Sequence, residues 1–366
     1  MRVVLITTFS CLTTVYGWAA SAGEPFRPLV PVQIYEVQKP FLDDNGTAKD
    51  LSGAACLPPG AVRRLHCLAI NDEGRAAQLF TVDGGHIEAG LMVPIIGEKP
   101  STKTLGAKPS KGCCPEGDGK FKELDGEGVA YAPPYFYIAG SHGCSRHSSK
   151  FRLSSFILAR IPVDGSGNPI KQAESPSNEE VSSSEKETTY RLADALRAAP
   201  NVGPFFLTDL NTANGLNVEG IAVLFDRVVV GLRAPSIDDR AFLVSARVDD
   251  LFAHGNEPLA VMPQVIPIHL GQNVGVRDLA PLPNGQLLVL AGPAQEQPEI
   301  PYSLFTVDPK VGGEVKRIAT LTDVVDDDGE RAKAEAVTVL DPDDLRLLVF
   351  FDGLENGGPR EYAVPK

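Results

Sequence analysis

The sequence predicts an all-β protein that folds as a β-propeller of five repeat units, and three observations support this prediction. The 366 residues include 35 glycines and 30 prolines, which interrupt helices and supply the turns between short strands. A short motif recurs five times, each time followed by an apolar strand. The two ends of the chain together have the length of one repeat and would complete the fifth unit, as expected for a closed ring.

The repeated motif is four residues long and reads Glu-Gly-hydrophobic-Ala in its most complete copies. The five copies are Ser52–Ala55, Glu127–Ala130, Glu219–Ala222, Arg277–Ala280 and Glu335–Thr338. The last three copies start at residues 219, 277 and 335, which are 58 residues apart. Equal spacing over three copies indicates a structural repeat.

An apolar strand follows each motif and ends in a polar or glycine-containing turn. These strands are Leu65–Ile70, Tyr135–Ala139, Arg227–Val230, Gln286–Leu290 and Arg346–Phe351. The two longer spacings contain polar, low-complexity segments at residues 97–120 and 165–199. We interpret both segments as insertions, the second of them with a short helix at Tyr190–Ala199.

Both termini contribute to the predicted closure of the ring. Residues 335–366 and 23–51 together approach one period, so the strand Val30–Val37 is expected to pair with the C-terminal strands. A period of 58 exceeds the usual blade of about 40–50 residues. This leaves room for a sixth blade within residues 85–120. A two-sheet sandwich is the alternative fold, and the equal spacings disfavour it.

Residues 1–22 have the pattern of a signal peptide. Arg2 precedes the apolar segment Val3–Trp18, and Ala20-Ser21-Ala22 forms a small-residue cleavage site. An uncleaved membrane anchor is the alternative, but the segment is barely long enough to span a bilayer. We therefore expect export to the periplasm or the medium, with residues 23–366 as a single mature domain without a transmembrane segment.

The charge of the chain restricts its partners. The formal net charge is −13, and an acidic surface repels the phosphate backbone of nucleic acids. General nucleic-acid binding is therefore excluded. The expected partners of this protein, which we predict to be a monomer, are a small anionic or polar ligand or another component of the cell envelope.

The cysteines suggest disulfide bonds, because export places them in an oxidising compartment. Cys56 and Cys67 lie on neighbouring predicted strands and are expected to pair. Cys144 is expected to pair with either Cys113 or Cys114, which leaves one thiol over. The alternative is a copper or zinc site that combines these cysteines with His142.

Four sequence features resemble an uncharacterised bacterial domain family found in exported proteins, and they span residues 50–355. These features are Glu127–Ala130, Gly231–Pro235, Arg277-Asp278-Leu279 and Ala291-Gly292-Pro293. The Glu-Gly-hydrophobic-Ala motif is more distantly similar to that of phytase-like and lactonase-like propellers. Ser52, Arg277 and Ala336 depart from it. The resemblance implies the propeller fold and brings no known activity.

Equivalent positions in a propeller lie at one height around the axis, so the repeat alignment predicts a site. One position holds Glu127, Glu219, Arg277 and Glu335, with Asp278 beside Arg277. A second position, at the end of the following strand, holds Asp72, His142, Arg233 and Asp352. If both face the channel, acids and arginines converge in one pocket.

These residue types suit several kinds of chemistry. Glu127, Glu219 and Glu335 offer hard oxygen ligands for Ca²⁺. Glu219, Glu335 and His142 are the candidate catalytic acids or bases, and Arg233 and Arg277 could hold an anion. With Asp72, Glu127, Asp278 and Asp352, the two arginines complete the predicted ligand-binding set. The alternative is structural, with glutamates and an Arg277–Asp278 pair that join neighbouring blades.

Two functions from different classes fit this pattern. The first is a metal-assisted hydrolase of a phosphoester or lactone at the channel mouth. The second is a non-catalytic propeller of the cell envelope that binds a ligand or a partner, because propellers serve many unrelated functions. Neither a P-loop, nor a dinucleotide fingerprint, nor a Gly-x-Ser-x-Gly motif occurs in the sequence.

Overall fold

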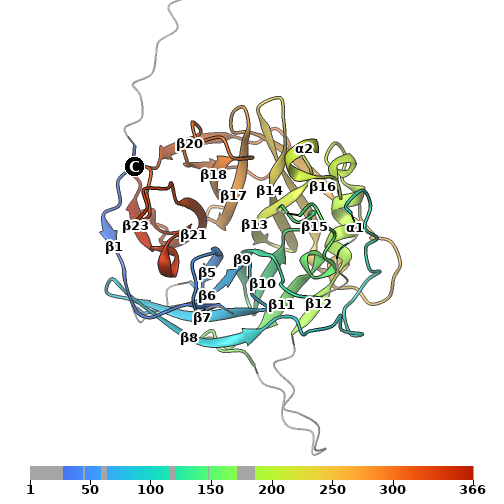
Figure 1. Cartoon of the computed structure of the whole chain (residues 1–366), viewed down its shortest axis with the longest axis horizontal. Coiled ribbons are helices and arrows are strands. Elements are labelled where there is room, and N and C mark those ends of the chain that lie inside the picture. Colours follow the sequence, from blue (N-terminus) through green and yellow to red (C-terminus); the bar gives the residue numbers. More distant parts are fainter. Residues whose placement is uncertain are drawn as a thin grey trace, which may run out of the picture.

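The protein is a five-bladed β-propeller (Figure 1). The computed structural model describes residues 28–43, 46–58, 64–115, 117, 121–146, 148–170 and 186–365. Within these ranges, five antiparallel sheets surround a central axis. The predicted signal peptide lies outside the described residues. Among those described, no helix is both long and apolar enough to cross a bilayer.

Each blade has four consecutive antiparallel strands, except where the termini contribute. The first blade contains β5 (Leu51–Cys56), β6 (Leu65–Asn71), β7 (Ala76–Asp83) and β8 (His86–Pro94), with β2 (Glu36–Lys39) added outside β8. The second contains β9 (Gly126–Ala132), β10 (Tyr135–Gly140), β11 (Leu158–Pro162) and β12 (Glu187–Thr189). The third contains β13 (Asn217–Leu224), β14 (Arg227–Ile237), β15 (Arg240–Arg247) and β16 (Gln264–His269).

The remaining two blades close the ring. The fourth contains β17 (Val274–Pro281), β18 (Leu287–Pro293), β19 (Ser303–Val307) and β20 (Val315–Thr320). The fifth contains β21 (Lys333–Asp341), β22 (Arg346–Asp352), β23 (Arg360–Ala363) and β1 (Gln33–Ile34). The short helices are α1 (Arg191–Ala198), α2 (Leu210–Ala213) and α3 (Val248–Leu251). A small hairpin consists of β3 (Leu42–Asp43) and β4 (Gly46–Thr47).

The five motifs form the innermost strands β5, β9, β13, β17 and β21. Their glycines permit close contact between neighbouring inner strands. A Cβ atom on Gly53 would lie 2.7 Å from the Cα of Gly128, and one on Gly220 would lie 2.9 Å from the Cα of Asp278. Both distances are too short for a real Cβ contact, so glycine is required where adjacent blades converge on the axis.

The ring closes through both termini, as predicted. Gln33 and Ile34 of β1 pair with Glu361 and Arg360 of β23. The expected strand Val30–Val37 is divided, because β2 leaves the fifth blade and pairs in parallel with β8 of the first. Leu29 also bridges to Leu321, just after β20 of the fourth blade. The N-terminal segment therefore connects the outer edges of three blades.

Aromatic packing holds the first and fifth blades together. The rings of Phe41, Phe80 and Phe350 meet edge to face, with centroid distances of 5.3, 5.8 and 6.1 Å. Each side chain is almost completely buried. Edge-to-face aromatic pairs contribute about 0.5–1.5 kcal/mol each beyond the burial of their area, so this cluster stabilises the point of closure.

A sixth blade is not formed in the described residues. Of the segment 85–120 in which it was expected, His86–Pro94 becomes β8 of the first blade. The insertion that follows packs on the second blade, where Leu105 N–H donates to Thr188 O and Tyr190 N–H donates to Leu105 O, both at 2.9 Å. The second insertion supplies β12 and α1, the latter where the short helix was expected.

Two disulfides are present among the described cysteines. Cys56–Cys67 joins β5 to β6, as predicted. Cys144 pairs with Cys114, so the pairing with Cys113 is wrong. Cys114 is buried beside Cys144, whereas Cys113 is exposed. The Cys114–Cys144 disulfide also occupies two of the three sulfur atoms of the alternative copper or zinc site, and Cys113 remains a free thiol.

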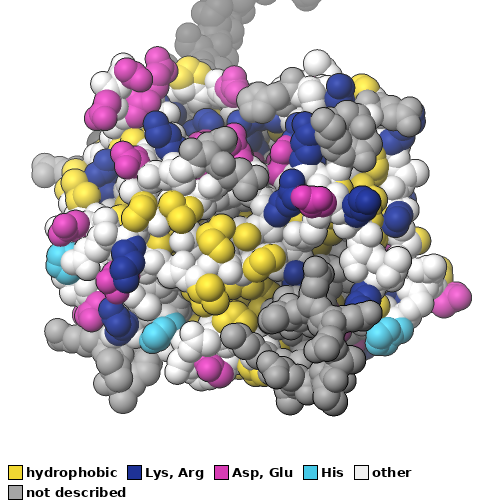
Figure 2. Space-filling model, turned by 60° about the horizontal axis from the view of Figure 1, so that its bottom comes forward, with side chains coloured by type: hydrophobic (Ala, Val, Ile, Leu, Met, Phe, Trp, Pro, Cys, Tyr) yellow, Lys and Arg dark blue, Asp and Glu magenta, His cyan; other side chains and the backbone are white. Residues whose placement is uncertain are grey.

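Charged side chains of both signs are interspersed around the edge of the molecule in a second view, and apolar side chains gather near its middle (Figure 2). The net negative charge therefore does not form one continuous acidic face on this side.

Candidate functional site

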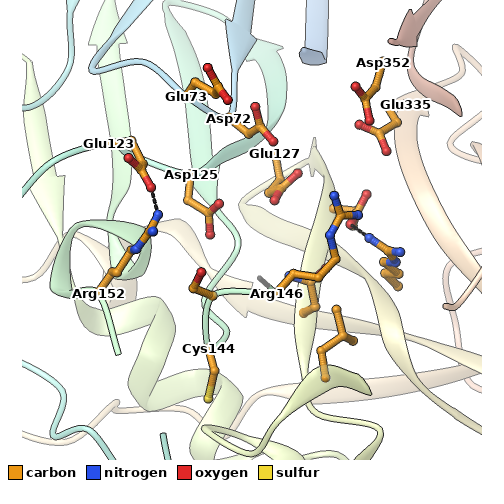
Figure 3. A pocket seen from close by; sticks show the side chains of 15 residues that line it. Asp72, Glu73, Glu123, Asp125, Glu127, Cys144, Arg146, Arg152, Glu335 and Asp352 are labelled. Carbon is orange, nitrogen blue, oxygen red and sulfur yellow. Dashed lines mark hydrogen bonds and ion pairs between the residues drawn. The ribbon is translucent and has the colours of Figure 1, made fainter. Parts of the chain in front are cut away.

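The inner strands begin at a cavity on the propeller axis (Figure 3). Its volume is about 430 Å³, which is within the range of small-molecule sites. The lining residues are Asp72, Glu73, Glu123, Asp125, Glu127, Cys144, Ser145, Arg146, Arg152, Leu210, Asn217, Glu219, Arg233, Glu335 and Asp352. Carboxyl groups outnumber arginines in this list, so the cavity is strongly acidic. We call it the axial pocket.

One side of the axial pocket is organised by a buried arginine. Arg277 extends from β17 and is only 1% exposed. Its guanidinium lies 3.6 Å from the Glu219 carboxylate of the third blade and forms an ion pair with Glu335 of the fifth. Burial alone would lower the pKa of Arg277, but these two carboxylates outweigh that effect and raise it. Arg277 therefore joins three blades beneath the pocket.

Arg233 is also occupied by protein partners. Its guanidinium donates to Glu219 Oε1 and to the backbone oxygen of Ala294, both at 3.0 Å. Arg152, on the opposite side, is paired with Glu123. Asp352 accepts from Lys333 Nζ at 2.5 Å. Most of the positive charge around the pocket is therefore already neutralised.

The other side of the pocket carries carboxyl groups that form no ion pair with a basic side chain of the described residues. Asp72, Asp125 and Glu127 belong to the first and second blades, and we call them the acid wall. Desolvation, followed by the charges of Asp125 and Glu335, raises the pKa of Asp72 to about 9. Desolvation, followed by the charge of Glu219, raises the pKa of Glu127 well above its usual value.

Hydrogen bonding within the acid wall is incomplete. Ser141 Oγ donates to Asp125, whereas Asp72 Oδ1 is buried and has no partner among the described residues. Asn217 begins β13, is 7% exposed and lines the same pocket. Its Oδ1 also lacks a partner in the described part of the chain. Unsatisfied buried acceptors are rare in native proteins and indicate a missing water, ion or ligand.

Glu335 differs from the acid wall because it combines burial with a cationic partner. Desolvation raises its pKa, Arg277 lowers it and Asp352 raises it again, which leaves the pKa of Glu335 at about 7. A carboxyl group that titrates near neutrality can both accept and donate a proton at physiological pH.

Three residues of the predicted site do not line the axial pocket: His142, Arg277 and Asp278. Asp278 is buried behind the inner strands, where its carboxylate accepts the N–H groups of Leu279 and Val337 at 2.7 Å each. It joins β17 to β21 and so has a structural role, but through backbone N–H groups rather than through the expected pair with Arg277, which binds Glu219 and Glu335 instead. His142 is fully buried against Phe156, and desolvation lowers its pKa to about 4.

Seven polar residues line the pocket that the repeat alignment missed: Glu73, Glu123, Asp125, Ser145, Arg146, Arg152 and Asn217. A signal was present for two of them, because Glu123 and Asp125 alternate with Glu127 in the sequence, and alternate residues of an extended chain point to the same side. The backbone departs from this pattern at Asp125, whose φ is 55°. Arg146 and Arg152 lie in a loop specific to the second blade, so no repeat pattern could identify them.

The geometry separates the predicted calcium ligands. Glu127, Glu219 and Glu335 all line the pocket, but Arg277 binds Glu219 and Glu335. A second acidic group at the rim of the first blade consists of Asp43, Asp50 and Glu73, whose carboxylate oxygens lie within 4.8 Å of one another, and Glu73 also lines the axial pocket. Oxygen ligands of this kind suit Ca²⁺, as do those of the acid wall with Asn217.

Comparisons with known proteins identify a family. Residues 115–360 match the sequence model of a family described as "Protein of unknown function (DUF3616)". No curated protein matches the chain.

Several solved structures are similar to the chain at low identity. Hydrazine synthase of Kuenenia stuttgartiensis is 12% identical, with 91% of this chain and 80% of that chain covered and a TM-score of 0.36. An α-L-arabinofuranosidase of Podospora anserina is 9% identical, with 92% and 98% covered and a TM-score of 0.41. An α-L-arabinanase of Penicillium chrysogenum is 11% identical, with 92% and 86% covered and a TM-score of 0.32.

Proposed function

The chain belongs to the family described as "Protein of unknown function (DUF3616)", and from that premise we propose that it is an exported hydrolase. Its axial pocket would use a divalent cation, with Ca²⁺ the best match, to cleave a small phosphoester or lactone. The observation that carries this proposal is the acid wall, whose crowded carboxyl groups form no ion pair with the described basic side chains. The two disulfides of the protein agree with export, because disulfide bonds persist in oxidising compartments.

The acid wall offers the ligand types that a hard cation takes. Ca²⁺ takes carboxylate and amide oxygens as ligands, and Asp72, Asp125, Glu127 and Asn217 supply these groups in one pocket. A bound cation would favour the ionised carboxylates and thereby relieve their mutual repulsion. It would also balance the acidic excess that otherwise repels an anionic substrate.

A divalent cation supplies Lewis-acid polarisation of a carbonyl or phosphoryl oxygen. The protein's own groups would provide the rest of the chemistry. Glu335, with a pKa of about 7, would transfer the proton to or from water or the leaving group. Glu219 would hold Arg233 and Arg277 in place, so its role would be positional.

The first test is a thermal melt of the purified protein with Ca²⁺ and with chelator. Ca²⁺ at a hundredfold its Kd adds about 2.7 kcal/mol, which raises Tm by a few degrees. We expect this rise to disappear in Glu127→Gln. The matched control is Asp43→Asn at the rim, which should keep the rise. A rise that disappears only in Asp43→Asn, or no rise at all, would overturn the calcium site.

The second test measures turnover of p-nitrophenyl phosphate and glucono-1,5-lactone with Ca²⁺ present. We expect Glu335→Gln to abolish turnover while the thermal rise remains, because Glu335 lies outside the acid wall. A calcium-dependent rise without turnover on an extended ester panel would instead support the second candidate, a non-catalytic ligand-binding propeller. That candidate is favoured by the absence of His142 from the pocket lining.

A further inference from the structure

We infer that Arg146 is the residue that binds the anionic group of the ligand, and that the Cys114–Cys144 disulfide holds it over the axial pocket. The ligand class that follows is a small molecule with a carboxylate or phosphate group. This inference rests on the proposed ligand pocket and adds to it a recognition residue and the device that positions that residue.

Arg146 differs from the other arginines of the pocket. Arg152 and Arg233 form ion pairs with Glu123 and Glu219, whereas no ion pair or side-chain hydrogen bond of Arg146 occurs among the described residues. Figure 3 shows the Arg146 side chain extending into the pocket, with its guanidinium between Glu127 and Glu335 in this view. Its donors are therefore available to a ligand.

The Arg146 guanidinium keeps its positive charge in this position. Burial acts to lower its pKa, but the carboxylates of Glu219 and Glu335 outweigh that effect and raise it. These carboxylates are already bound by Arg277 and Arg233. A guanidinium with five N–H donors binds carboxylate or phosphate oxygens in bidentate fashion. An anionic group in the pocket would therefore accept hydrogen bonds from the Arg146 guanidinium.

Arg146 lies two residues after Cys144, which itself lines the pocket. The Cys114–Cys144 disulfide fastens this loop to the first insertion. Phe151 N–H also donates to Pro115 O at 2.9 Å, and Ser145 N–H donates to Lys150 O at 2.9 Å. On the other side, Asn211 Nδ2 donates to the backbone oxygen of Arg146 at 3.3 Å.

These contacts make the disulfide the covalent anchor of the loop. A long arginine side chain loses considerable conformational entropy when it binds a ligand. A loop that is fastened close to the arginine reduces this loss, because its backbone is already placed. Without the disulfide, we expect Arg146 to sample positions away from the pocket and anion affinity to fall.

The test measures anion binding by isothermal titration calorimetry in saturating Ca²⁺. The probes are gluconate, a carboxylate, and methylphosphonate, a phosphate analogue without an ester bond that the proposed hydrolase could cleave, so the two titrations distinguish the two ligand classes. We expect Arg146→Ala to weaken binding of the preferred probe about 10- to 100-fold, in line with the loss of a charge-assisted hydrogen bond. Arg146→Lys keeps the charge and should restore part of this affinity.

The role of the disulfide is tested with Cys114→Ser/Cys144→Ser in a Cys113→Ser background, which removes the third thiol. We expect about a tenfold weaker anion Kd and an unchanged calcium-dependent rise in Tm. The matched control is Cys56→Ser/Cys67→Ser, which removes a disulfide from the first blade and should keep the wild-type Kd. If the Cys114 variant does not fold, Asn211→Ala loosens the same loop and should also weaken binding.

The outcomes separate this inference from the proposed function. Loss of the calcium-dependent rise in the wild-type protein would defeat the proposed function itself. A normal rise combined with wild-type anion affinity in Arg146→Ala would overturn only the role of Arg146. Equal weakening in both disulfide variants would overturn the positioning role of Cys114–Cys144. Absence of binding by either probe to the wild-type protein would overturn the assigned ligand class.

Discussion

Arg277 and Glu335 form a buried ion pair across the boundary between the fourth and fifth blades. The two residues occupy equivalent positions in their repeats, 58 residues apart. The fourth motif has arginine where three of the other motifs have glutamate. Arg277 thus provides the positive charge that a ring of buried glutamates requires. Removal of one partner from a buried pair leaves an uncompensated charge.

We therefore predict that Arg277→Met lowers the free energy of unfolding by about 3–5 kcal/mol. Chemical denaturation at neutral pH measures this change. The matched control is Arg247→Met, whose exposed pair with Asp226 at 3.5 Å should contribute less than about 1 kcal/mol. Equal effects of the two substitutions would show that Arg277 does not support the ring.

The acid wall should make stability depend on pH. The pKa of Asp72 is about 9 in the folded protein and ordinary in the unfolded chain, so the folded state binds more protons between pH 4 and 9. Stability therefore falls as pH rises through this range. We predict that Asp72→Asn flattens this fall and gains at least about 1.4 kcal/mol at pH 8 without Ca²⁺, the equivalent of one pKa unit.

Urea denaturation over this pH range measures the effect of Asp72→Asn. The exposed Glu98 provides the control substitution Glu98→Gln, which should leave the curve unchanged. Ca²⁺ should reduce the fall in the wild-type protein if it binds the acid wall. A wild-type curve that rises from pH 5 to 8 in the absence of cation would contradict the prediction.

Close contact between inner strands should make one motif glycine sensitive to substitution. We predict that Gly220→Ala destabilises the fold by about 1–3 kcal/mol, because its Cβ would press on the backbone of Asp278. Gly165→Ala is the control, since its Cβ would meet open space and should change stability by less than about 0.5 kcal/mol. Thermal unfolding compares them, and a tolerated Gly220→Ala would show that the blades can move apart at little cost.

The N-terminal segment should contribute to stability through Tyr35. Its hydroxyl donates to Glu361 Oε2 at 2.8 Å, and Glu361 is 1% exposed on β23. We predict that Tyr35→Phe lowers the free energy of unfolding by about 1.5 kcal/mol, the lower end of the range for a hydrogen bond to a charged group. Tyr131→Phe, whose hydroxyl has no hydrogen bond to the described residues, is the control. Denaturation midpoints that coincide for both variants would contradict this role.

Much of the fold followed from the sequence. The five motifs predicted the five blades, because a repeat must place equivalent residues at equivalent positions. The lengths of the terminal fragments predicted that β1 would close the ring. The possible sixth blade was inferred from the spacing of 58 residues, and it is not formed in the described residues. A spacing alone does not distinguish loop residues from strand residues. Residues 86–94 complete the first blade instead.

The pocket was predictable only in part. Repeat alignment placed Glu127, Glu219 and Glu335 together on the axis, where the structure also has them. It did not show that Arg277 would bind two of them, because pairing depends on which side chains meet across a blade boundary.

The sequence by itself thus determined the blades, their order and the acidic nature of the axis, since these depend on local periodicity and composition. Only the tertiary structure decided which acids stay without a partner, that Cys114 rather than Cys113 binds Cys144, and that Arg146 reaches the pocket from a loop. These features depend on contacts between residues distant in the chain, and packing around the axis determines such contacts.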